Sequence, residues 1–258
     1  MPNLDLAMRA EPAFAFLLLL AGAAALSSAP PAMAQDTPEP TAHDFSGLYF
    51  PAGFGRRRPN PLPFTPEAQA LADQYMQDFE VNDDPGRYCI WPGMPRAPWG
   101  APFAIEVIHR PQDLTIYWEG YAMYRKVYMA DHNPPEAILP SAMGHSIAHW
   151  EGDVLVIETD HLKTYPYMNR FPTTADAHVT ERMWLEERED DGVKHKYLID
   201  EVTTVDPKLY TEPVVVSAQA QYRPDLQILE YECSVTLWEN YLQQRGLTLP
   251  DVDALPEP

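Results

Sequence analysis

The sequence predicts an all-β fold: an antiparallel meander of about nine or ten strands that closes into a barrel, with one helix and proline-rich loops. From Phe103 onward, apolar and polar residues alternate with a period of two, which is typical of half-buried strands. Short turns such as Glu151-Gly152-Asp153 separate these runs, and no helical pattern lies between them, which excludes parallel βαβ units. A closed barrel leaves no edge strand and suits this order, while a two-sheet β-sandwich is the alternative.

The strand signals follow one another along most of the chain. The expected strands are 45–50, 103–110, 113–120, 122–130, 145–150, 154–159, 178–189, 194–205, 214–223 and 226–235.

One helix is predicted before the meander. Thr65 suits the N-cap position and Pro66 the first helical position. Apolar residues then recur at helical spacing until Asn82-Asp83-Asp84-Pro85-Gly86 ends the pattern. The proline-rich stretches 51–66 and 89–99 are predicted to be loops.

The first 34 residues have the order of a secretory signal peptide. Arg9 precedes an apolar run from Ala13 to Leu26, which is shorter than the roughly 20 residues that span a membrane, and Ala32-Met33-Ala34 suits a cleavage site. We therefore expect a mature protein that begins at Gln35, has no membrane span, and is periplasmic or extracellular. The expected organisation is 1–34 signal peptide, 35–44 disordered lead-in, 45–240 single β-rich domain and 241–258 C-terminal tail.

The composition is strongly acidic. The chain has 18 Lys and Arg against 38 Asp and Glu. Removal of residues 1–34 takes Arg9, Asp5 and Glu11, so 17 basic residues remain against 36 acidic ones, a formal charge of −19. Such a surface repels phosphate backbones, so nucleic acid is not an expected partner.

Two cysteines, Cys89 and Cys233, lie in the expected mature chain. In an oxidising compartment the simplest interpretation is that they form a disulfide, with two separate buried thiols as the alternative. A bridge at Cys89 would anchor a proline-rich segment that has few backbone ladders to hold it.

The candidate site residues lie on two strands. His178, Arg182 and Trp184 share one strand face, and Val179, Glu181 and Met183 share the other, so either face could be the interior. With the histidine face inward, these side chains and His145 would form a ligand-binding set, with His145, His178 or Glu181 as candidate catalytic groups. No histidine spacing is typical of a metal site, and no metal or cofactor is expected.

Several short blocks give the chain a family resemblance. They are Ser46-Gly47, Leu62 to Ala68, Pro92-Gly93-Met94-Pro95-Arg96, Met143-Gly144-His145-Ser146, Trp150 to Val156 with Thr159, His178 with Glu181-Arg182, Asp206-Pro207-Lys208, Tyr231-Glu232-Cys233 and Glu239-Asn240. With these blocks the chain resembles a widespread group of uncharacterised secreted bacterial proteins, which implies an exported β-rich domain and no particular activity. The opening Phe45-Ser46-Gly47-Leu48-Tyr49 also distantly resembles the start of lipocalin-type barrels, which would make the fold lipocalin-like or calycin-like.

Three function classes follow from these observations. The leading hypothesis is an exported barrel that binds a small, largely apolar molecule with polar contacts from His145, His178 and Arg182. The first alternative is an enzyme, a lyase, isomerase or hydrolase with a histidine general base. The second alternative is an envelope protein whose loops recognise another protein. The sequence does not decide whether the chain is an enzyme.

Overall fold

A computed structural model describes residues 40–53, 59–80, 83–99, 102–130 and 137–256, which all belong to one compact unit. The expected signal peptide, the cleavage point before Gln35 and most of the lead-in lie outside the described residues.

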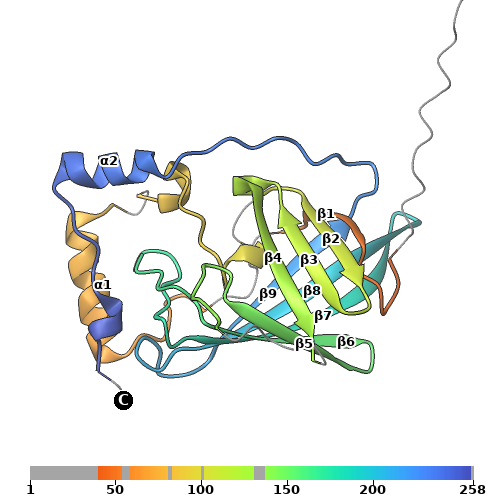
Figure 1. Ribbon diagram of the computed structural model, residues 1–258, viewed down its shortest axis with the longest axis horizontal. Helices are drawn as coiled ribbons and strands as arrows, with labels where there is room; N and C mark the ends of the chain where they lie inside the picture. Colours follow the sequence, from red (N-terminus) through yellow and green to blue (C-terminus); the bar gives the residue numbers. More distant parts are fainter. Residues whose placement is uncertain (1–39, 54–58, 81–82, 100–101, 131–136, 257–258) are drawn as a thin grey trace, which may run out of the picture. The chain divides into compact units, whose positions relative to one another are not determined.

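The described chain forms a closed nine-stranded β-barrel, in which each strand pairs with its neighbours in sequence and β1 pairs with β9 (Figure 1). The strands are β1 (Gly47–Pro51), β2 (Ile105–Arg110), β3 (Asp113–Trp118), β4 (Met123–Met129), β5 (His145–Glu151), β6 (Val154–Asp160), β7 (His178–Asp190), β8 (Val193–Val205) and β9 (Val214–Tyr222). The prediction of an all-β barrel is confirmed: the nine strands form one closed sheet and not the two sheets of a β-sandwich.

One strand pair departs from the antiparallel prediction. β4 and β5 run parallel, with Val127 opposite Ser146 and Met129 opposite Ala148. β4 ends at Met129 and β5 begins at His145, a separation longer than a tight hairpin loop, and a parallel pair requires such a long connection. The other strand pairs in the described chain are antiparallel.

The prediction of a last strand over 226–235 is wrong. β9 ends at Tyr222, and after a stretch without strand structure the chain enters the helix α2 (Thr236–Arg245). The physical reason is ring closure: β9 already pairs with β8 on one side and β1 on the other, so no free edge remains for a tenth strand.

The predicted helix is present as α1 (Pro66–Asp78), and the Thr65 hydroxyl accepts a hydrogen bond from the Ala68 amide at 3.2 Å. α1 and α2 lie together beside the barrel (Figure 1), and both contribute to one hydrophobic cluster. Trp238 of α2 and Val252 are buried in this cluster, so the expected boundary at residue 240 falls inside α2.

The predicted disulfide between Cys89 and Cys233 is confirmed, with Cα atoms 5.5 Å apart. It joins the end of a short 3₁₀ helix, η1 (Pro85–Tyr88), to the segment before α2. The Ser234 amide also donates a hydrogen bond to Cys89 Sγ. The bridge therefore holds two segments that have no strand ladder of their own.

Candidate functional site

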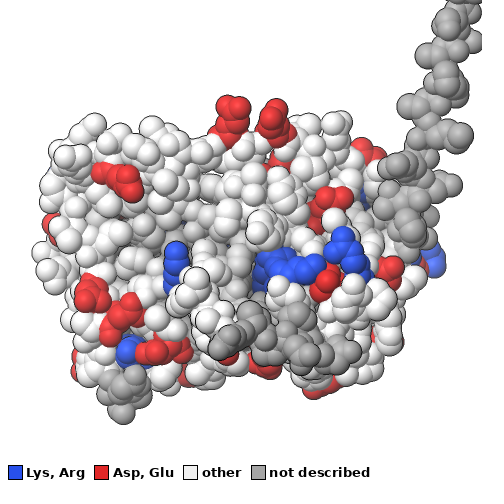
Figure 2. Space-filling model, viewed as in Figure 1, with Lys and Arg blue, Asp and Glu red and all other residues white. Residues whose placement is uncertain are grey.

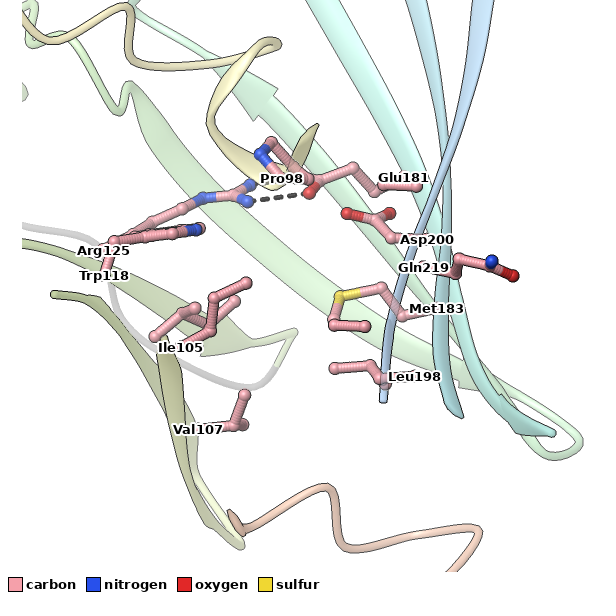
Figure 3. A pocket seen from close by; sticks show the side chains of 13 residues that line it. Pro98, Ile105, Val107, Trp118, Arg125, Glu181, Met183, Leu198, Asp200 and Gln219 are labelled. Atoms are coloured by element: carbon pink, nitrogen blue, oxygen red, sulfur yellow. Dashed lines mark hydrogen bonds and ion pairs between the residues drawn. The ribbon is translucent and has the colours of Figure 1, made fainter. Parts of the chain in front are cut away.

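A small chamber inside the barrel has an apolar lining with a charged group at one end (Figure 3). Its volume is about 30 Å³, which is room for a water molecule or two. Apolar side chains from β2, β3, β7, β8 and β9 form most of the wall, and Arg125, Glu181 and Asp200 form the charged end. In Figure 3 the Asp200 carboxyl and the Met183 sulfur point into the chamber, whereas the Gln219 amide points away.

Arg125 is the centre of the charged end, and only 1% of its side chain is exposed. Nη1 donates to Glu181 Oε1 at 2.8 Å and Nη2 donates to Oε2 at 2.5 Å, a two-bonded ion pair. The same guanidinium donates to the Ser146 hydroxyl at 2.9 and 3.1 Å and to the Thr159 hydroxyl at 2.8 Å. A buried guanidinium needs such partners, because an unpaired charge in the interior costs several kcal/mol.

The local fold explains why an arginine lies at this position. Met123, Arg125 and Val127 alternate onto the inner face of β4, and Val127 is the first residue that pairs with β5. Just before this pairing begins, the Arg125 side chain can extend across to Ser146 on β5, Thr159 on β6 and Glu181 on β7. Arg125 therefore connects four strands where the β4–β5 ladder is short.

Asp200 lies beside this ion pair on the inner face of β8. Burial raises the pKa of Asp200 well above its ordinary value, and the negative charge of Glu181 and a hydrogen bond with Glu181 raise it further, against the opposing charge of Arg125. The fold therefore favours the protonated form of Asp200. Glu181 is the ion-pair partner of Arg125, because its two carboxylate oxygens accept both hydrogen bonds.

Two buried polar atoms of the chamber lining have no hydrogen-bond partner among the described residues. They are the Trp118 indole Nε1, a donor, and Asp200 Oδ1. Because the hydrogen bond with Glu181 uses the other carboxyl oxygen of Asp200, Oδ1 is left as an acceptor. A hydroxyl group can accept a hydrogen bond from an indole N–H and donate one to a carboxyl oxygen, so it has the chemistry that both atoms lack.

The structure places the four expected ligand-binding residues on the outer face of the barrel. His178 pairs with Glu158 at 2.6 Å, Arg182 pairs with Glu151 at 2.9 Å, and both are about half exposed. Trp184 lines a groove on the outer face of β7, β8 and β9. His145 is half-buried and its ring stacks on Tyr128.

These four side chains therefore do not line the interior chamber, and the structure adopts the alternative in which Val179, Glu181 and Met183 form the core face. Of the candidate catalytic groups, only Glu181 reaches the chamber. Most of the face shown in Figure 2 is neither acidic nor basic; acidic side chains are scattered over it, and basic side chains gather mainly near its middle.

Arg125, Asp200 and Trp118 were not among the residues singled out from the sequence. A signal was present: on three strands a charged residue stands between two apolar residues of the inner face. These triplets are Met123-Arg125-Val127, Val179-Glu181-Met183 and Leu198-Asp200-Val202. A charged residue at a core position requires a partner, so the three could have been matched to one another.

Comparisons with protein-family models and with curated proteins found no match to this chain. Within the described ranges, no cluster of three or more His, Cys, Asp or Glu side chains has the geometry to hold a metal ion. None of the described helices has the length and apolar character needed to cross a membrane.

Replacement of Asp200 by asparagine is expected to flatten the pH dependence of stability. The folded-state pKa of Asp200 is raised, so its protonated form stabilises the fold. This contribution to the free energy of unfolding is fully present below about pH 4, and it is lost as the pH rises through the folded-state pKa. The stability of the native chain relative to Asp200→Asn should therefore fall as the pH rises from about 4. Urea unfolding of both proteins at several pH values measures this difference.

The control is Glu189→Gln, which removes an exposed carboxylate near the end of β7. The free energy of unfolding of this control variant should vary with pH as that of the native chain does. A constant difference between the native chain and Asp200→Asn at all pH values would show that Asp200 ionises normally.

Proposed function

We propose that this chain is an exported barrel protein that binds a small, largely apolar molecule carrying one hydroxyl group. The observation that supports it is the presence of a buried donor, Trp118 Nε1, and a buried acceptor, Asp200 Oδ1, both without a partner among the described residues, in the lining of a mostly apolar chamber. Binding sites for small molecules commonly combine an apolar wall with a few polar groups that fix orientation. The disulfide fits export, because such bonds persist in oxidising compartments.

The size of the chamber limits the ligand. A cavity of about 150 Å³ accommodates benzene, so a chamber of 30 Å³ must widen before a ring can enter. Met183 and Leu198 form part of the wall, and methionine is the side chain that adapts most readily to a changed cavity. The proposed ligand is therefore no larger than a single ring with its hydroxyl.

The buried ion pair supports a fixed orientation of the ligand. Arg125 holds Glu181 by two hydrogen bonds, and Glu181 in turn holds Asp200, so Asp200 Oδ1 has one defined direction. A ligand hydroxyl would be recognised as a donor by Asp200 and as an acceptor by Trp118. An ether of the same size lacks the donor and should bind more weakly, because one buried acceptor stays unsatisfied.

Phenol is the probe for this proposal, and anisole is its comparison compound without a donor. We expect phenol to shift the indole N–H resonance of Trp118 in a saturable manner. The affinity for anisole should be lower than that for phenol by a factor of about ten or more. The measurement is a nitrogen–proton correlation spectrum, in which Trp118→Phe identifies the resonance. Asp200→Asn should preserve phenol binding, because its amide can donate to Glu181 and its oxygen stays an acceptor.

Asp200→Leu removes the acceptor and should abolish the preference for phenol over anisole. Ala218→Leu reduces the chamber volume and should abolish binding of both compounds, whereas Glu201→Gln on the outer face should change neither. Equal responses of the native chain and Asp200→Leu to phenol would contradict the proposal, since the Asp200 acceptor would then play no part in binding.

A further inference from the structure

A second and larger pocket lies between η1, the proline-rich segment after it, and the short 3₁₀ helix η3 (Gly120–Ala122). Its volume is about 200 Å³. The residues of its lining that matter here are Asp84, Arg87, Trp91, Arg96, Phe103 and Tyr121. We call it the aromatic pocket; it shares no lining residue with the barrel chamber.

Three aromatic rings build the wall of this pocket. The Tyr121 ring centre lies 4.8 Å from that of Trp91 and 6.3 Å from that of Phe103, with the Phe103 ring edge-on. The Tyr121 hydroxyl donates to the Gly86 carbonyl at 2.7 Å, which fixes its ring. A planar apolar ligand could stack on or contact these rings edge to face.

The aromatic pocket has more positive than negative charge, although the whole chain has a net charge of −20. Asp84 is the carboxylate of the lining, and it already pairs with Arg170 at 3.2 Å and accepts from the Gly86 amide at 2.9 Å. Arg96 lies farther from Asp84, at 3.7 Å. Arg87 is exposed and forms no ion pair with any described residue. The pocket lining therefore contains two guanidinium groups and one carboxylate.

The backbone around the aromatic pocket is strained. Cys89, Tyr121 and Ala122 have φ values of 70°, 65° and 49°, in the left-handed region that side chains with a Cβ atom disfavour. Such conformations persist where the surrounding structure holds them in place, and they concentrate at ligand sites. The disulfide at Cys89 supplies one such constraint.

We propose that the aromatic pocket binds a small aromatic carboxylate, a single ring that carries one carboxylate group. The rings of Trp91, Phe103 and Tyr121 contact the ligand ring, and Arg87 and Arg96 bind its carboxylate by charge-assisted hydrogen bonds. The volume fits this class, because about 150 Å³ accommodates benzene and the remaining space suits a carboxylate.

Benzoate is the probe, and isothermal titration calorimetry at low salt and about pH 7 is the measurement, since screening weakens such contacts. We expect saturable binding of benzoate. The affinity should be lower by a factor of about ten or more for benzyl alcohol, which lacks the charge, and for acetate, which lacks the ring. Arg87→Ala and Arg96→Gln should each weaken benzoate binding by about tenfold or more. Arg182→Ala, an exposed arginine on the outer face of β7, is the matched control and should leave it unchanged.

Unchanged benzoate affinity in Arg87→Ala, or equal binding of benzyl alcohol and benzoate, would overturn the proposal. If Arg96→Gln fails to fold, Arg87→Ala decides alone, because the Arg87 side chain is exposed and its loss leaves no buried charge. Asp200→Leu should retain benzoate binding, so failure here and failure of phenol binding in the barrel chamber are separate results.

Discussion

Arg125→Met is expected to lower the free energy of unfolding by about 3–5 kcal/mol, the usual cost of removing one partner of a buried ion pair. The loss leaves the Glu181 carboxylate buried without a cation and next to Asp200. It also leaves Ser146 and Thr159 without their shared donor. Urea unfolding followed by circular dichroism measures the change.

Two further variants test the origin of this loss. Arg125→Met combined with Glu181→Gln should recover part of the stability, because the uncompensated buried charge is then gone. Arg182→Ala breaks the exposed pair with Glu151 and should cost at most about 1 kcal/mol. If Arg125→Met costs no more than Arg182→Ala, the buried network does not stabilise the barrel.

Loss of the disulfide in a Cys89→Ser, Cys233→Ser double variant is expected to lower the free energy of unfolding by about 5 kcal/mol. The bridge spans a sequence separation of 144 residues, and the chain-entropy account assigns large effects to long loops. This value is comparable with the total stability of many domains. Unfolding of the native chain with and without reductant gives the same comparison without a mutation.

Hydrogen exchange should locate where the reduced protein loosens first. Residues 83–99 and α2 are expected to exchange earliest, because local contacts rather than strand ladders hold them. The central strands β7 and β8 should keep their protection, since thirteen residue pairs join them. Equal unfolding free energies of the oxidised and reduced chains would contradict the stabilising role of the bridge.

Much of the fold could be predicted because local patterns determine it. The period-two runs predicted the eight strands after Phe103, a separate strand signal at 45–50 predicted β1, and the Thr65-Pro66 signal predicted the start of α1. The run 226–235 has the same local pattern, yet it is not a strand, because the ring is already closed by β1 and β9. α2 has only one buried side chain, Trp238, so its amphipathic signal is weak.

The candidate site was harder to predict than the fold because it depends on which strand face turns inward. His178 and Glu181 are three residues apart on one strand and therefore lie on opposite faces, one paired at the surface and one buried. The local sequence of β7 is compatible with either orientation. The matching charged positions on β4 and β8 resolve this ambiguity only when the three strands are considered together.

The parallel pair of β4 and β5 is a consequence of the number of strands. Each antiparallel pair reverses the strand direction, so a closed ring in which every pair is antiparallel must contain an even number of strands. This ring has nine strands and therefore needs at least one parallel pair. That pair has a ladder of only three residue pairs and lies beside the buried guanidinium of Arg125. Gain or loss of one strand would make the ring even, and neither the parallel pair nor the long connection between β4 and β5 would then be needed to close it.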